Sequence, residues 1–138
     1  MKMRTTTETG RFGEELAAKL LRKKGYKILE RNFRAGHNEI DIIAENKEYT
    51  VFVEVKTRTE HKVFGFEYGE PADAVNLGKQ RRTVQAAKAY LYKRDENDEE
   101  HDRMIRFDII EVYLKDAMFS SSPALLKIEH MEDAFRPR

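Results

Sequence analysis

The strongest constraint on the fold of this 138-residue chain is a pair of apolar runs, residues 39–45 and 49–56, separated by three polar residues. Both runs are rich in isoleucine and valine, and the polar break predicts two antiparallel strands joined by a tight turn. Neither face of such a sheet is freely polar, so charged side chains inside the runs need an explanation. There are four of them: Glu39, Asp41, Glu54 and Lys56.

The length of the turn decides whether these charges share a face. If residues 46 and 47 form the turn, Glu39 lies opposite Glu54, and Asp41 is a diagonal neighbour of Glu54 at roughly 7–8 Å between backbones. A three-residue loop would reverse the alternation and scatter the charges over both faces. The shared face therefore depends on a turn of even length.

Carboxylates that face one another in a half-buried sheet repel each other and are costly to desolvate, so a cation would have to accompany them. Mg²⁺ or Mn²⁺ suits this role because hard divalent cations prefer carboxylate, carbonyl and water oxygens. Asp41 and Glu54 would be ligands, Val55 could add its backbone carbonyl, and Lys56 could position a water or pair with phosphoryl oxygens. This is the chemistry of metal-assisted phosphodiester hydrolysis.

The alternative interpretation is structural, because alternating Glu and Lys on a strand are most often the solvated face of a sheet. Spacing alone leaves the two interpretations evenly matched. An observed register that separated Asp41 from Glu54 would remove the metal-site interpretation.

The remaining sequence predicts two helices and further strands. One helix begins at residues 7–9 and stops at Gly25, and a second covers residues 76–94. Helices that flank a run of strands need a sheet between them, so we expect an α/β or α+β fold with one domain, residues 1–138, and a central mixed β-sheet flanked by α-helices. Strands are expected at residues 26–30 and 105–114, and residues 124–135 could supply a final strand. A basic connection is expected at 31–38 and a long loop at 57–75.

Composition excludes several classes of protein. The chain has no cysteine, which rules out disulfides and thiolate metal sites, and no apolar stretch of signal-peptide or membrane-span length, so a cytoplasmic location is expected. The net charge is only +1, but residues 79–94 carry six basic residues and no acid, while residues 95–102 carry six acids. Basic segments of this kind are either solvated helix faces or contacts for nucleic acid.

A further acid, Glu14, borders the buried stripe of the first predicted helix. At 100° per residue it lies about 20° from Leu21 and about 60° from Ala17 around the axis. Glu14 therefore does not lie on the side of the helix opposite the buried stripe.

Three short motifs in this order resemble a known family: Gly10-x-x-Gly13-Glu14, Glu39-x-Asp41 and Glu54-x-Lys56-x-Arg58. Together with "GYKILERNFR" and "RFDII" they are similar to the YraN-like family of small bacterial proteins, which are predicted nucleases. That family is considered a distant relative of archaeal Holliday junction resolvases within the PD-(D/E)xK superfamily. The resemblance covers most of the chain and implies a restriction-endonuclease-like fold.

The resemblance also implies roles for individual residues. Asp41 and Glu54 match the metal-binding acids, Lys56 matches the catalytic lysine, and Glu14 matches the first-helix acid that resolvase-like members bring to the metal. Glu39 is either an outer partner of the site or simply a charge at the start of a strand.

One position departs from the family pattern, and two other polar residues are expected to have no catalytic role. Asn38 occupies a position where the family usually has glycine, and the neighbouring His37 is expected to be a turn residue and not a metal ligand. Asp108 of "RFDII" is expected to be structural, paired with Arg106 or with a turn amide.

Partners follow from the same resemblance. Arg58, Lys79 and Arg82 match basic positions that could contact the nucleic-acid backbone, which positions a strand without reading its sequence. The expected substrate is DNA, in branched or otherwise structured form, with residues 59–75 as a lid or substrate contact. Resolvase-like relatives act as dimers, so a homodimer is compatible with this interpretation.

Two further functions compete with a metal-dependent endonuclease. One is a catalytically silent nucleic-acid-binding or adaptor protein of the same fold. The other, weaker alternative is a purely structural protein whose carboxylates are exposed or separately paired.

Overall fold

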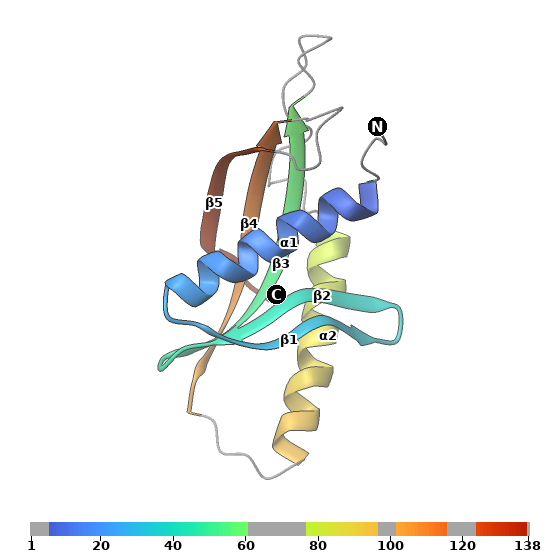
Figure 1. Cartoon of the computed structure of the whole chain (residues 1–138). Helices are drawn as coiled ribbons and strands as arrows, with labels where there is room; N and C mark the ends of the chain where they lie inside the picture. The colour runs from blue at the N-terminus through green and yellow to red at the C-terminus, as the bar shows by residue number, and fades with distance from the viewer. Residues whose placement is uncertain (1–5, 61–76, 97–101, 116–123, 138) are drawn as a thin grey trace.

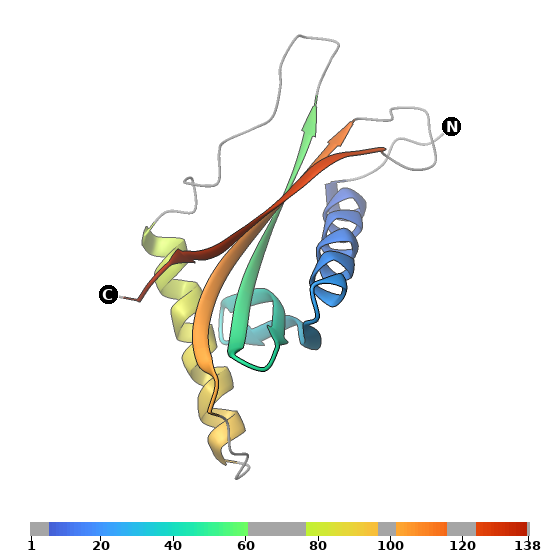
Figure 2. The ribbon, with the colours of Figure 1, turned by 90° about the vertical axis from the view of Figure 1, so that its left-hand side faces the viewer.

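A computed structural model describes residues 6–60, 77–96, 102–115 and 124–137 of the chain (Figure 1). It contains one five-stranded β-sheet with a helix on each face, and Figure 2 shows the sheet edge-on between them. The expected α/β architecture with a mixed sheet is therefore confirmed. No helix in the described part is long and apolar enough to cross a membrane.

The first helix, α1, spans Thr6–Lys23 and ends as the sequence predicts. Gly25 has a φ of 95°, which L-residues rarely adopt and glycine tolerates. The amide of Gly25 donates to the carbonyl of Arg22 (3.0 Å), and the amide of Tyr26 donates to that of Leu21 (2.9 Å). These two bonds form a Schellman cap, which satisfies the last carbonyls and turns the chain into the sheet.

The sheet has strands in the order β1-β2-β3-β4-β5. Neighbours are antiparallel except β3 and β4, which are parallel. A parallel pair needs a crossover, and α2, Leu77–Glu96, lies in that connection. The strands are β1 Lys27–Ala35, β2 Asn38–Glu45, β3 Tyr49–Glu60, β4 Met104–Lys115 and β5 Ala124–Phe135.

Two predicted boundaries are wrong. The strand predicted at 26–30 continues to Ala35, so most of the predicted basic connection belongs to β1 and only residues 36–37 form the turn. A register shift after Ile28 and a left-handed residue, Asn32, interrupt the alternation that would have indicated a strand. Residues 57–60, predicted as loop, extend β3, and the rest of that loop lies outside the described residues.

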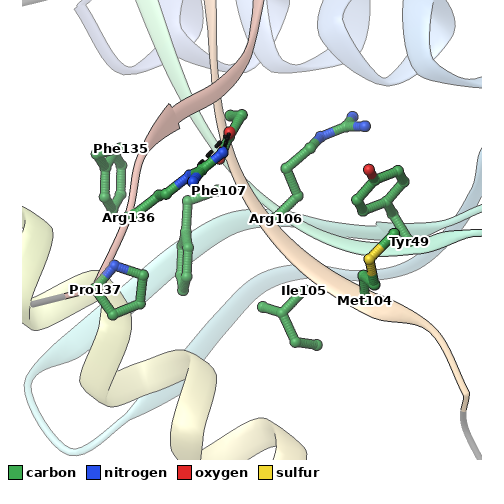
Figure 3. A pocket seen from close by; sticks show the side chains of 9 residues that line it. Tyr49, Met104, Ile105, Arg106, Phe107, Phe135, Arg136 and Pro137 are labelled. Atoms are coloured by element: carbon green, nitrogen blue, oxygen red, sulfur yellow. Dashed lines mark hydrogen bonds and ion pairs between the residues drawn. The ribbon is translucent and has the colours of Figure 1, made fainter.

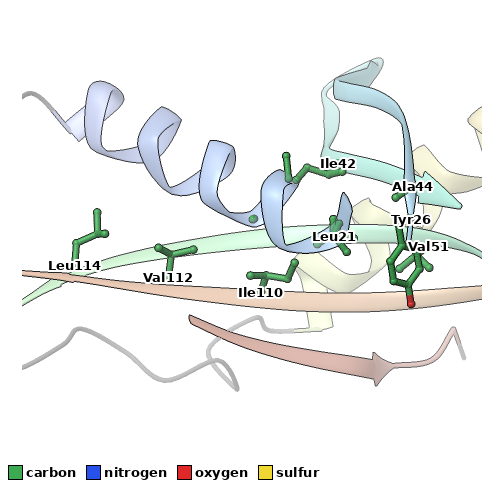
Figure 4. Close-up of a cluster of buried hydrophobic side chains, with 11 residues drawn as sticks. Leu21, Tyr26, Ile42, Ala44, Val51, Ile110, Val112 and Leu114 are labelled. Carbon is green, nitrogen blue, oxygen red and sulfur yellow. The ribbon is translucent and has the colours of Figure 1, made fainter. Parts of the chain in front are cut away.

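The core has two parts because successive residues of β3 point to opposite faces. Val51 and Val53 pack beneath α1 in one cluster, which Figure 4 shows together with Leu21 and Ile110. Phe52 faces the other way and packs beneath α2, where it stacks on Phe107 with ring centroids 5.5 Å apart. Each helix is thus fixed to its own side of the sheet.

Candidate functional site

The hairpin between β2 and β3 has an even loop, but it is longer than predicted. Glu45 pairs with Thr50, so the loop between the paired residues contains residues 46–49 and not 46–47, although Tyr49 already belongs to β3 through its pairing with Met104. The Asn46 side chain closes it by accepting hydrogen bonds from the amides of Glu48 (3.0 Å) and Tyr49 (2.8 Å). The predicted opposition of Glu39 and Glu54 is therefore wrong. The alternation is unchanged, because the register moved by two residues.

In the observed register Asp41 is the next residue after the last ladder pair, Ile42 with Val53. Continuing that register by one pair places Asp41 opposite Glu54. The ladder stops there, and the Asp41 carboxylate instead accepts a hydrogen bond from the Val55 amide at 2.8 Å. The side chain of Asp41 thereby bridges the point where β2 and β3 separate.

Glu54 is almost fully buried and carries two lysines on the same oxygen. Its Oε1 lies 2.5 Å from Nζ of Lys79 and 3.5 Å from Nζ of Lys56, while the Glu54 side chain is only 9% exposed. Lys56 comes from the same strand two residues later, whereas Lys79 reaches over from the first turn of α2. The chain thus supplies its own cations to this buried acid.

Asp41 lies in an environment that opposes its charge. Burial, the neighbouring Glu54 and the neighbouring Glu14 together raise the pKa of Asp41 to about 8, against the opposing effects of the Val55 amide and Lys79. Burial also raises the pKa of Glu14, while Arg31 and a hydrogen bond with Asp41 lower it. The acids from α1, β2 and β3 are therefore electrostatically coupled.

The pKa values of Lys56 and Lys79 shift in opposite directions. Burial and the adjacent Lys79 lower the pKa of Lys56. Burial also acts against the charge of Lys79, but contacts with Glu54 and Lys56 outweigh it and raise the pKa of Lys79. Lys79 is the firmly charged member of the pair, and Lys56 is the one more ready to lose a proton.

Glu14 reaches the site because α1 approaches β3 very closely. A Cβ at the preceding residue, Gly13, would overlap the side-chain oxygen of Thr57 and would lie only 3.0 Å from its Cβ and Cγ2 atoms. Only glycine lets the helix lie at this distance, and that closeness carries Glu14 toward Asp41. The other glycine of the motif, Gly10, has nothing within 4 Å of such a Cβ.

Sequence reasoning missed Asn32, which connects two of the acids. With its amide oriented to donate, its nitrogen lies 3.1 Å from Oε1 of Glu14 and 3.3 Å from Oε1 of Glu39. Its backbone has a φ of 52°, and in the β1–β2 register it falls opposite Asp41. Asparagine is depleted in strands and enriched in the left-handed region, so its place between strand residues was the available signal.

Glu39 lies at the margin of the site. Its side chain is 39% exposed, and Oε2 lies 3.7 Å from NH2 of Arg34. The bond from Asn32 links it to Glu14, as an outer partner of the site would be linked. His37, two residues before Glu39, lies in the exposed turn, as predicted.

The proposed phosphate contacts lie in different environments. Nε of Arg58 donates to Oε2 of Glu111 at 2.6 Å, and the side chains are only 10% and 4% exposed. Arg82 is exposed on α2. Lys79 lies inside the acid cluster, on Glu54. Of the three, Arg82 alone combines exposure with a position away from the buried acids.

The donor chemistry of this cluster fits a hard divalent cation. Asp41, Glu54 and Glu14 offer carboxylate oxygens, and Val55 offers a backbone carbonyl, which are the ligand types that Mg²⁺ and Mn²⁺ prefer. Within the described ranges, no three acidic or histidine side chains already converge as a metal-binding group. Lys79 and the Val55 amide contact carboxylate oxygens that a metal would use.

A cavity of about 480 Å³ lies elsewhere, between the start of β4 and the end of β5 (Figure 3). Tyr49, Phe107 and Phe135 contribute to its lining, and none of the lining residues belongs to the acid cluster. Its acid, Asp133, is paired with Arg136 at 2.6 Å. The cavity is therefore separate from the candidate site.

Comparison with known proteins concerns the segment that carries all of the predicted acids and lysines. The family model described as "Uncharacterised protein family UPF0102" matches residues 13–112. The chain belongs to the UPF0102 family. Its members include a protein of Chlorobium chlorochromatii that is 46% identical over 132 residues, which is 95% of this chain and 93% of that protein.

Other UPF0102 proteins match over similar lengths. One from Caldanaerobacter subterraneus subsp. tengcongensis is 42% identical over 135 residues, covering 98% of this chain and 100% of the relative. One from Clostridium botulinum is 42% identical over 120 residues, covering 87% and 91%. Family membership is thereby confirmed, and the names of these relatives state no activity.

Proposed function

We propose that this UPF0102 protein is a divalent-metal-dependent nuclease of restriction-endonuclease-like fold that hydrolyses phosphodiester bonds in DNA. The observation that supports it most strongly is the meeting of Asp41 and Glu54 where β2 and β3 separate. Glu14 contacts Asp41 from α1, and Lys56 lies on Glu54. Acids held together against repulsion are costly to keep in a fold, which favours a functional reason for them.

The proposed roles follow from the contacts. Asp41, Glu54 and the Val55 carbonyl would hold Mg²⁺ or Mn²⁺, with Glu14 as a further ligand. When bound, such a cation polarises the phosphodiester and lowers the pKa of a bound water. Lys56, whose pKa is lowered by burial and by Lys79, can orient that water or exchange a proton with it.

DNA would approach along the basic side of α2. Exposed Arg82 is suited to a phosphate, and such contacts position a strand without reading its bases. Branched or otherwise structured DNA is the substrate class we favour, and a homodimer is the assembly that would suit it.

A second candidate is an adaptor that binds nucleic acid without cutting it. The contact between Glu54 and Lys79 favours this candidate, because the protein already neutralises an acid that the metal would use. In that case DNA binding would not depend on the acids.

The deciding experiment is a cleavage assay on single-stranded, duplex, flapped and four-way DNA with Mg²⁺ or Mn²⁺. Wild type is compared with Asp41→Asn and Lys56→Met, and Lys127→Met serves as a matched control because Lys127 is an exposed lysine of β5. The proposal expects cleavage by wild type and the control and its loss in the two site variants. DNA binding without cleavage in wild type would support the adaptor, and equal cleavage by all variants would locate the activity elsewhere.

A further inference from the structure

Lys79 occupies a position that general helix energetics disfavour. It is the third residue of α2, and the first turn of that helix contains no acid. The N-terminal end of a helix carries partial positive charge, so acids stabilise it and a lysine does not. The lysine must therefore be held there by something outside the helix.

The candidate site holds it. Nζ of Lys79 lies 2.5 Å from Oε1 of Glu54. Burial opposes the charge of Lys79, but the contacts with Glu54 and Lys56 and the attraction of Glu54 and Asp41 outweigh it and raise the pKa of the lysine. Nζ of Lys56 lies 3.5 Å from the same oxygen, and Lys56 is two residues after Glu54 in β3. The helix lysine is thus the closest cation to an acid that needs one.

We propose that Lys79 is the internal counter-cation of the metal-free site, and that a divalent metal displaces it from Glu54 so that its ammonium can bind a phosphate of the nucleic acid. This inference rests on the proposed metal site. It couples metal binding to nucleic-acid binding through one side chain, because the same ammonium competes with the metal for Glu54 and then binds a phosphate of the nucleic acid.

Electrostatics favours this exchange over coexistence. A divalent cation on Glu54 would repel an ammonium at hydrogen-bonding distance from the same oxygen. The Lys79 side chain is 34% exposed and has a flexible four-carbon stem, so it can swing toward solvent without unfolding α2. A phosphate bound beside the metal then offers it a new negative partner.

The inference is tested by measuring Mn²⁺ and Mg²⁺ affinity of the full chain by calorimetry, without DNA. Lys79→Met removes the competing charge, Lys79→Gln is a second neutral variant in case the first is poorly folded, and Lys79→Arg keeps a permanent charge. Lys88→Met is the matched control, since Lys88 is an exposed lysine of the same helix. We expect the neutral variants to bind metal about fivefold or more tightly than wild type, and the arginine variant and the control to resemble wild type.

A second readout measures the coupling itself. In wild type, saturating Ca²⁺ or Mn²⁺ should strengthen binding of a nuclease-resistant phosphorothioate DNA, and this gain should shrink by about fivefold or more in Lys79→Met and not in Lys88→Met. Equal metal affinity in wild type and both neutral variants overturns the inference while leaving the proposed nuclease intact. Absence of metal binding in wild type and in the variants overturns both.

Discussion

Gly13 of α1 lies against Thr57 of β3 so closely that a methyl group on the glycine would overlap the threonine Oγ1. Gly13→Ala is therefore expected to destabilise the protein by about 1–3 kcal/mol, because the helix must move away from the sheet. The same movement withdraws Glu14 from Asp41. Urea unfolding measures the first effect, and metal affinity measures the second.

Gly10 provides a matched control for that substitution. It lies in the same helix with open space around it, so Gly10→Ala should be neutral or stabilise by up to about 1 kcal/mol through helix propensity. Equal destabilisation by both substitutions would show that the close approach at Thr57 has no special role.

Asp41→Asn is expected to stabilise the metal-free protein at pH 7 by about 0.5–2 kcal/mol. Burial and Glu54 oppose the charge of Asp41, and asparagine keeps an oxygen that can accept the Val55 amide. Saturating Mn²⁺ should reverse the order, because wild type gains binding energy that the variant lacks. Thermal unfolding with and without metal measures both, with Asp95→Asn as an exposed control. A wild type that remains less stable than Asp41→Asn in saturating metal would contradict the metal site.

Asp108 should make stability depend on acid pH. It is fully buried, and the bonds from His130, Arg106 and the Asp133 amide overcome the effect of burial and lower its pKa. A lowered pKa in the folded state stabilises the fold above the unfolded value of about 3.9, and this contribution is lost as pH falls through the folded value. Asp108→Asn removes the buried charged partner of Arg106 and leaves only the more distant Glu132, so it should cost about 3–5 kcal/mol at pH 7.

The measurement for Asp108 is urea unfolding at pH 7 and at pH 3, with exposed Asp102→Asn as control. The difference between Asp108→Asn and wild type should narrow at the lower pH, because below about 3.9 the carboxylate takes up a proton in the unfolded wild-type chain before it does so in the folded protein. A difference that stays constant between the two pH values would mean that the substitution acts through packing and not through charge.

Asn32 combines two roles that substitutions can separate. Asn32→Gly accepts the φ of 52° and removes the amide, so the protein should fold with near-wild-type stability but hold Glu14 less firmly. Asn32→Asp keeps the shape and adds a carboxylate beside Glu14 and Glu39. Repulsion among these carboxylates should make the metal-free variant less stable than wild type, and the loss of stability should be larger at pH 8 than at pH 5. Stability of both variants at these two pH values and their metal affinity are the readouts, and an aspartate variant indistinguishable from wild type would argue against the link to the acids.

The alternation of strand side chains carried most of the sequence-based prediction of this site. It kept Asp41 and Glu54 together even though the loop is two residues longer than predicted, because a shift of two preserves the face. Gly25 and the pairing of Asp108 with Arg106 were predictable because a helix stop and a contact between residues two positions apart are local chemistry. The bond from the Asp133 amide to Asp108 comes from β5, 25 residues away, and is not local.

The contacts that escaped prediction depend on tertiary packing. Lys79 meets Glu54 because α2 lies across the sheet, and nothing in the spacing of these residues specifies that approach. Arg58 was expected to face a phosphate, but the parallel pairing of β3 with β4 places it beside Glu111. Asn32 was hidden because its left-handed backbone interrupts the pattern that identifies a strand.

Arg58 and Arg82 should therefore differ when each is replaced by methionine. Arg58→Met leaves Glu111 buried without its ion pair and should cost about 3–5 kcal/mol of stability, whereas Arg82→Met, at an exposed position, should change stability by less than about 0.5 kcal/mol. Arg82→Met should instead lower the affinity for DNA. The affinity should fall uniformly across sequences and depend less steeply on salt, because one phosphate contact is lost. Urea unfolding and a salt titration of DNA binding measure the two effects. Weakened DNA binding by a fully folded Arg58→Met would restore Arg58 as a phosphate contact despite its pairing with Glu111.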